Sequence, residues 1–255
     1  MGIALRYLRS DLRIQAVDES AKAASSYAVD ISAFFQGEEQ RYGDIDGRWR
    51  AGAIIQNLGP KIKYDDSGSE TFLPTNLRLG TGFDFLLDQY NKVSVTAEFA
   101  KLLVPTPPIL GYEYNFTDNN ENGVYDEDID ELGEQTTGEL IVYNGQTTDV
   151  DFLQGVFQSF SDAPGGFSEE LKEFTWALGA EYVYDDSFAL RAGYFNESED
   201  KGARKFLALG AGFKFSGTRV DLSYLFSASR VPSPLENTLR FSLTFDFGSN
   251  TYLEY

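Results

Sequence analysis

The chain has 255 residues, with 40 Asp and Glu against 21 Lys and Arg, which gives a formal net charge of −19. A phosphate backbone would repel this charge, so the composition argues against nucleic-acid binding. His and Cys are both absent, which excludes a Ser–His–Asp triad, a Cys/His zinc site and disulfide bonds. No apolar run comes near the roughly 18 residues that a spanning helix needs.

The amino terminus reads directly as a strand. Met1 leads into Gly2–Leu8, whereas a secreted protein should begin with a basic segment, an apolar stretch and a small-residue cleavage site. Two interpretations follow, a cytoplasmic protein or an amino-terminal truncation. The strands described next favour a truncated chain that forms a single domain over residues 1–255.

Period-two alternation of apolar and polar residues recurs along most of the chain. Near the carboxyl end, for example, Leu239, Phe241 and Leu243 alternate with Arg240, Ser242 and Thr244. Such alternation is typical of strands with one apolar face. It predicts about ten strands, near residues 2–9, 23–37, 47–58, 71–87, 91–101, 173–186, 187–198, 203–216, 217–228 and 236–248.

These strands favour an antiparallel transmembrane β-barrel over a soluble β-sandwich. Both folds have one apolar face, but the predicted strands run to roughly 9–12 residues, as membrane strands do, rather than the 5–6 of globular sheets. The polar face carries full charges that suit a water-filled lumen. The predicted lumen-lining residues are Arg78, Asp84, Glu98, Glu181, Arg191, Asp221 and Arg240. For each of them, pairing within the lumen is an alternative to a direct role.

The connection at residues 102–172 is long and acidic, and no Lys or Arg occurs between Lys101 and Lys172. We expect an extracellular loop without regular strands, which covers one end of the barrel. Connections of this length usually carry function or are disordered.

One segment of this loop resembles the opening of an EF-hand calcium loop. Oxygen-bearing side chains recur at alternate positions, and Gly123 provides the sharp turn. The predicted ligands are Asp118, Asn120, Asn122, Asp126 and Asp128. Position twelve is Ile129 instead of Glu, so Asp126, Asp128 or Asp130 would have to close the site. The alternative is an acidic, solvated loop. No cofactor is therefore required, and calcium in the 118–128 loop is one of two open alternatives.

The end of the loop is predicted to be helical and packed. Phe152, Phe157 and Phe160 recur at helical spacing near residues 150–160, and we expect them to bind a partner. A second short helical turn is predicted at Ser168–Glu173, with Ser168 as its cap.

Several long strings resemble the PorV family of outer-membrane proteins in the type IX secretion system. They are Asn57–Tyr64, Phe72–Gly80, Asn91–Pro107, Ser161–Phe174, Ala189–Phe195 and Pro234–Gly248. The resemblance implies a barrel similar to the fatty-acid transporter FadL, with fourteen strands in the full protein, in the outer membrane of a Gram-negative bacterium. It also implies no enzymatic activity.

The resemblance further implies a role as a cargo shuttle. Proteins of this family receive cargo from the translocon pore by binding its carboxy-terminal signal domain, and deliver it to the PorU sortase for attachment to the cell surface. The alternative is a FadL-like transporter of hydrophobic small molecules, which would have an apolar lumen and an opening in its wall. A third interpretation, an enzyme with a Ser–Lys dyad, is supported by no motif.

Overall fold

The computed structural model describes residues 1–11, 23–64, 70–120, 123, 125–136, 138–229, 231 and 234–246. Ten long strands form one antiparallel sheet in which each strand pairs with the next along the chain. They are β1 (Gly2–Ser10), β2 (Ala24–Gln36), β4 (Ile45–Leu58), β5 (Asn76–Leu86), β6 (Asn91–Leu102), β11 (Phe174–Tyr184), β12 (Phe188–Asn196), β13 (Lys205–Phe215), β14 (Thr218–Ser227) and β15 (Thr238–Phe245). The predicted all-β antiparallel fold is confirmed.

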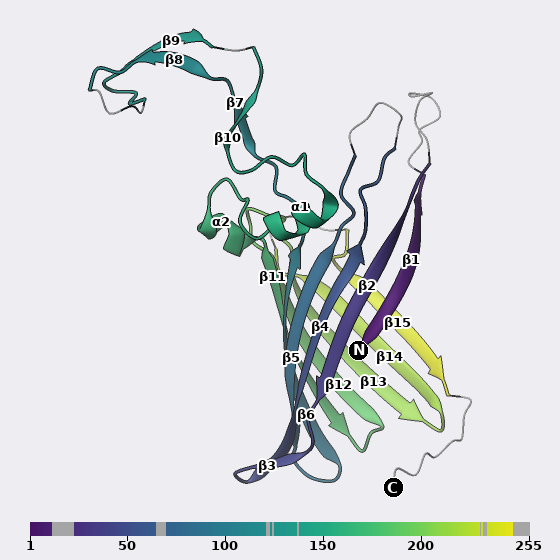
Figure 1. The fold of residues 1–255 in the computed structure, drawn as a ribbon. Coiled ribbons are helices and arrows are strands. Elements are labelled where there is room, and N and C mark those ends of the chain that lie inside the picture. The colour runs from purple at the N-terminus through teal and green to yellow at the C-terminus, as the bar shows by residue number, and fades with distance from the viewer. Residues whose placement is uncertain are drawn as a thin grey trace.

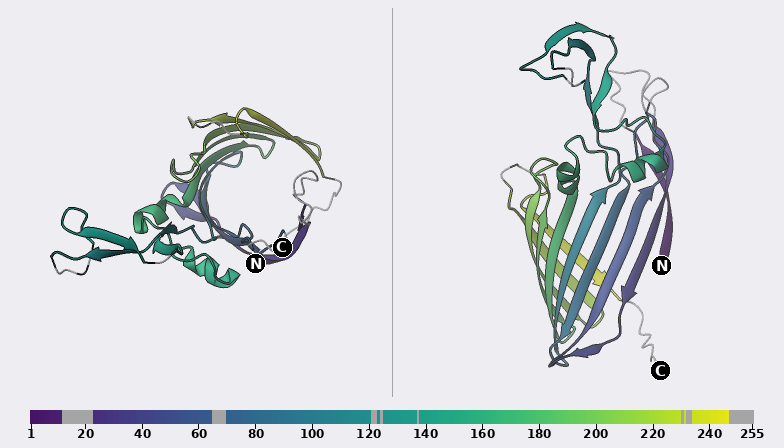
Figure 2. Two further views of the ribbon diagram at one scale, coloured as in Figure 1. Left: turned by 90° about the horizontal axis from the view of Figure 1, so that it is seen from above. Right: turned by 60° about the vertical axis from the view of Figure 1, so that its left-hand side comes forward.

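The sheet curls into an open ring of strongly tilted strands (Figure 2). Across the described residues its two edges, β1 and β15, do not pair with each other. In the same residues, no helix is both long and apolar enough to cross a membrane.

The two faces of the sheet differ as the alternation predicts. Leu79 lies opposite Phe99, and Phe99 lies opposite Trp176, so apolar residues share one face. Leu79 and Phe99 keep 47% and 54% of their surface exposed, whereas Asp84 on the other face keeps 2%. The polar face is therefore the concave one.

The two ends of the sheet differ in their connections (Figure 1). At one end, β11 joins β12 through Asp185–Ser187 and β13 joins β14 through Ser216 and Gly217, both tight turns with positive φ at non-glycine residues. We call this the short-turn end. A small strand, β3 (Gln40–Tyr42), pairs there with the beginning of β4. The opposite, long-loop end carries the connection between β6 and β11.

That connection has two parts. The arm, residues 109–144, projects away from the sheet (Figure 1) and consists of two hairpin-like pairs. β7 (Ile109–Gly111) pairs with β10 (Ile141–Asn144), and β8 (Tyr114–Thr117) pairs with β9 (Glu131–Gln135). The expectation of a loop without regular strands was therefore wrong, because these strands are too short to show a clear alternation in the sequence.

The second part, residues 145–173, we call the lid. It contains α1 (Phe152–Gln158) and α2 (Phe167–Lys172), which lie over the long-loop end of the sheet (Figure 1). Both predicted helical segments are confirmed. The predicted cap of the second was wrong, because the helix begins two residues earlier, after Gly166, whose φ of 66° favours glycine.

One predicted strand boundary was also wrong. The strand expected over residues 71–87 begins at Asn76, because Pro74 cannot donate a backbone hydrogen bond to a sheet. Residues 247 and 248 of the last predicted strand lie outside the described residues.

Candidate functional site: the lid and its charged anchor

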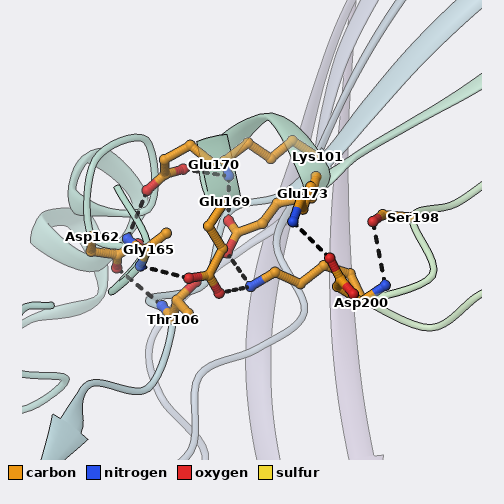
Figure 3. A network of polar contacts seen from close by, with 12 residues as sticks. Lys101, Thr106, Asp162, Gly165, Glu169, Glu170, Glu173, Ser198 and Asp200 are labelled. Carbon is orange, nitrogen blue, oxygen red and sulfur yellow. Dashed lines mark hydrogen bonds and ion pairs between the residues drawn. The ribbon is translucent and has the colours of Figure 1, made fainter. Parts of the chain in front are cut away.

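The lid is attached to the sheet through Lys101, near the end of β6. The side chain of Lys101 is 0% exposed, and its Nζ lies 3.1 Å from Glu170 Oε2 and 2.5 Å from Glu173 Oε2 (Figure 3). The same Nζ lies 5.2 Å from the ring centroid of Phe174. A buried ammonium is costly unless it is paired, so the two lid carboxylates stabilise Lys101 and are held by it.

A second lysine reaches the same cluster from the connection between β12 and β13. Lys201 Nζ lies 2.5 Å from Glu169 Oε1 and 3.0 Å from Glu173 Oε1. Glu173 also accepts a hydrogen bond of 2.6 Å from the Thr106 hydroxyl. Glu173 therefore joins three segments that are far apart in the sequence (Figure 3).

These contacts shift the pKa values of the groups involved. A hydrogen bond from Lys201 lowers the pKa of Glu169, and the Gly165 N–H adds to this effect. Burial opposes ionisation of Glu173, but hydrogen bonds from Lys101, Thr106 and Lys201 outweigh it and lower the pKa of Glu173. Burial would lower the pKa of Lys201, but its bonds to Glu169 and Glu173 raise it. These directions favour the ionised forms of Glu169, Glu173 and Lys201.

Asp162 lies at the base of the lid and is only 1% exposed. Its Oδ2 accepts a hydrogen bond of 3.0 Å from the Thr106 N–H, whereas its buried Oδ1 has no hydrogen-bond partner among the described residues. Burial raises the pKa of Asp162, and the charges of Glu170 and Glu173 raise it further. In this network, Asp162 is thus the carboxyl group whose ionisation is disfavoured by its surroundings.

Backbone groups of the lid are held by the same carboxylates. Glu170 Oε1 accepts a hydrogen bond of 2.8 Å from the Ala163 N–H, and Glu169 Oε2 accepts one of 2.7 Å from the Gly165 N–H. Each carboxylate therefore connects a lysine to the turn that precedes α2. The arrangement holds α2 and the turn before it against the end of the sheet.

The lid exposes several large apolar side chains. Phe157 on α1 and Phe167 on α2 are 75% and 77% exposed, and Leu153, Phe160 and Leu171 are also exposed. Of the three predicted partner-binding residues, the structure exposes Phe157 and Phe160 but half-buries Phe152. Their binding role stays a prediction.

α1 sits tightly on the sheet end. A methyl group at Gly155 would come within 2.5 Å of the Phe72 ring and 3.0 Å of Pro105. Only a glycine allows this close approach.

The predicted lumen-lining residues share the concave face and pair across neighbouring strands. Asp84 lies 2.7 Å from Arg50 and 2.9 Å from Arg48, and Arg78 lies 3.8 Å from Glu98. Arg191 forms a second such group, whereas Arg240 faces a serine. Arg191 lies 2.5 Å from Glu181 and 2.6 Å from Asp221, and Arg240 stands opposite Ser223 in the register.

The predicted calcium loop lies at the tip of the arm. Asp118 accepts hydrogen bonds from the N–H groups of Asn120 and Gly123, and the Asn120 amide donates to Asp126 at 2.7 Å. Asn122 lies outside the described residues. In the part of the arm that the structure describes, no three acidic side chains lie close enough together to hold a metal ion, and Asp128 belongs to no such group. Calcium binding stays a prediction.

Sequence reasoning missed the anchor of the lid. Lys101, Glu170 and Glu173 come from positions about 70 residues apart, and nothing in the sequence pairs them. One signal was present, since the acidic connection has no cation of its own between Lys101 and Lys172. A connection of this kind must find its counter-charges on the elements beside it.

The comparisons with known proteins concern the first part of the chain. The family model described as "Type IX secretion system protein PorV" matches residues 1–109. No curated protein matches the chain.

Proposed function

We propose that the chain is a non-enzymatic outer-membrane component of the type IX secretion system that receives secreted cargo. The similarity of residues 1–109 to the PorV family model supports this proposal. In this proposal the lid binds the carboxy-terminal signal domain of the cargo at the translocon pore. The protein then delivers the cargo to the PorU sortase and the attachment complex.

The apolar surface of the lid is the observation that carries this proposal. Phe157 and Phe167 stand almost fully exposed on a segment that is otherwise fixed by buried ion pairs. Large exposed aromatic side chains on a rigid support are typical of protein-binding surfaces, because little conformational entropy is lost on binding.

The outer face of the sheet supports a membrane location. Leu79, Phe99, Leu178 and Leu190 all project from this face and remain about half exposed. In the outer membrane these side chains would contact lipid, whereas the paired charges of the concave face would stay in a polar interior. The long-loop end, with the lid, would then face the cell exterior.

Substitution of the two lid aromatics tests the proposal. We expect the double substitution Phe157→Ser and Phe167→Ser to reduce capture of cargo about tenfold or more. Aromatic side chains that become buried on binding contribute most of the binding energy in many interfaces. The measurement is quantitative mass spectrometry of proteins purified with the chain from detergent-solubilised outer membranes. Tyr143→Ser is the matched control, since Tyr143 is also 77% exposed but lies on the arm.

Transport of hydrophobic small molecules is the alternative to cargo binding. The paired charges around Asp84 and Arg191 make the concave face a poor path for a fatty acid. Recovery of lipid without any secretion component in the same purification would favour transport and would contradict the proposed role.

A further inference from the structure

The concave face carries a polar pocket at the short-turn end, away from the lid. Its volume is about 310 Å³, which is near the lower limit for small-molecule sites. The pocket lies along β11 to β14, and its floor contains the small residues Ala189 and Gly212. A methyl group at Gly212 would come within 2.5 Å of Asp221 Oδ1, so the floor is already closely packed.

One wall of the pocket is formed by three interacting charged groups. Arg191 binds Glu181 on one side and Asp221 on the other, at 2.5 Å and 2.6 Å. Both carboxylates are therefore engaged by the arginine between them, and the three groups together carry a net charge of −1.

Three further cations line the same pocket. They are Lys92 on β6, Lys214 on β13 and Arg219 on β14. Lys214 stands directly opposite Arg219 in the strand register, and like charges in this position repel each other. Within the ranges that the structure describes, none of the three forms an ion pair with a carboxylate.

Cations are in the minority in the chain as a whole. Acidic residues outnumber basic ones 40 to 21, so a basic side chain would normally find a carboxylate nearby. Lys92 and Lys214 are also half-buried, so they are not simply surrounded by water. Asp186, at the adjacent turn, is the only other acidic residue that lines the pocket.

We propose that the pocket binds a small oxyanion, a phosphate or a carboxylate, through Lys92, Lys214 and Arg219. An anion between Lys214 and Arg219 would replace their repulsion with two attractive, charge-assisted contacts. The pocket volume of about 310 Å³ leaves room for an anion of this size. The site is separate from the lid and from the binding of cargo.

Titration of the purified protein in detergent tests the proposal. Inorganic phosphate and succinate are the two probes, measured by calorimetry and by the shift in unfolding temperature. We expect at least one probe to bind and to raise the unfolding temperature, with affinity that falls as sodium chloride is added. Arg219→Gln and Lys214→Gln should each weaken binding about tenfold or more.

Arg240→Gln is the matched control, because it removes one positive charge from the same face without touching the pocket. The absence of binding by both probes to the unsubstituted protein would overturn the proposal. So would an equal loss of affinity in Arg240→Gln and Arg219→Gln, because it would indicate a general charge effect. Without ligand, Arg219→Gln should fold at least as well as the unsubstituted chain, since it removes a repulsion.

Discussion

The lid and the arm belong to the same connection, yet they are held in opposite ways. The lid is fixed by side chains from elsewhere in the chain, through Lys101 and Lys201. In the described residues, the strands of the arm pair only with each other, and most of their side chains are exposed. Isolated two-stranded pairs of this kind are marginally stable in water.

This difference teaches where a rigid binding surface can be built on such a connection. Exposed aromatics occur on both parts, for example Phe157 on the lid and Tyr143 on the arm. On the lid they stand on a support whose position is determined by buried charges. This contrast supports the proposal that the lid recognises cargo, and the following predictions test it.

Removal of the buried cation should have the largest effect. Lys101→Met leaves Glu170 and Glu173 without their main counter-charge, and breaking a buried pair typically costs about 3–5 kcal/mol. We expect the lid to detach, which would be measured as faster hydrogen exchange at the Ala163 and Thr106 amides. Limited proteolysis should cut the lid while the sheet stays intact.

Lys172→Met is the control for this change. Lys172 pairs with Asp200 at 2.7 Å, but both side chains are largely exposed, so water already screens the pair. We expect no measurable change in lid exchange. Equal effects of the two substitutions would mean that net charge, rather than the buried contact, holds the lid.

Substitution of Gly166, which precedes α2, by alanine should have an intermediate effect on the stability of the lid. Gly166 has a φ of 66° and a ψ of −154°, a conformation that side chains rarely adopt, so Gly166→Ala should cost about 1–3 kcal/mol of lid stability. Gly138→Ala on the arm, where the space around the residue is open, should cost almost nothing. Denaturant titration followed by lid proteolysis would compare the two.

The attachment of the lid should weaken in acid. The folded pKa values of Glu169 and Glu173 lie below their ordinary value of 4.5, so their contribution is present above that pH. It is lost as the pH falls through the folded values. The opening of the Gly165 amide, measured from pH 7 to pH 3 as the exchange rate relative to the intrinsic rate at each pH, should rise most steeply below about 4.5.

The ionisation of Asp162 should affect the stability of the lid in the opposite direction. Its folded pKa is raised above 3.8, so its ionisation weakens the lid as the pH rises past that value. Asp162→Asn keeps an oxygen for the Thr106 N–H and should leave the lid unchanged or slightly more stable at pH 7. A clear loss of stability at pH 7 would show that the charge of Asp162 is needed.

Deletion of the arm should have the smallest effect on the lid. Ile109 and Asn144 are partners in the strand register, so a short Gly–Ser link can replace the residues between them. We expect exchange at Ala163 to stay within about twofold of the intact chain, because the lid contacts the sheet directly. A large increase would mean that the arm supports the lid.

Sequence predicted the long strands well because their alternation is strong and repeated. Leu239 to Phe245 shows the pattern plainly, and the register confirms it. The predicted start of the strand at residue 71 was wrong. The apolar residues Phe72 and Leu73 extend the sequence pattern toward the amino terminus, but Pro74 prevents strand pairing before Asn76. The arm was missed because its strands have three to five residues.

The candidate site was only half predictable. Helical spacing marked Phe157 and Phe160, because periodicity is a local property of the sequence. The anchor depends on Lys101 meeting Glu170 and Glu173 across the fold, a contact that no local pattern encodes. Likewise, the facing of Lys214 and Arg219 emerged only with the strand register.

The most direct test of the central claim is site-specific photo-crosslinking in cells that secrete cargo through the type IX system. A photoreactive phenylalanine analogue would be placed at Phe157, at Phe167 and, for comparison, at Tyr143. The account predicts crosslinks to carboxy-terminal signal domains from Phe157 and Phe167, and few or none from Tyr143. Crosslinks to cargo from Tyr143 alone, with none from the lid, would contradict it.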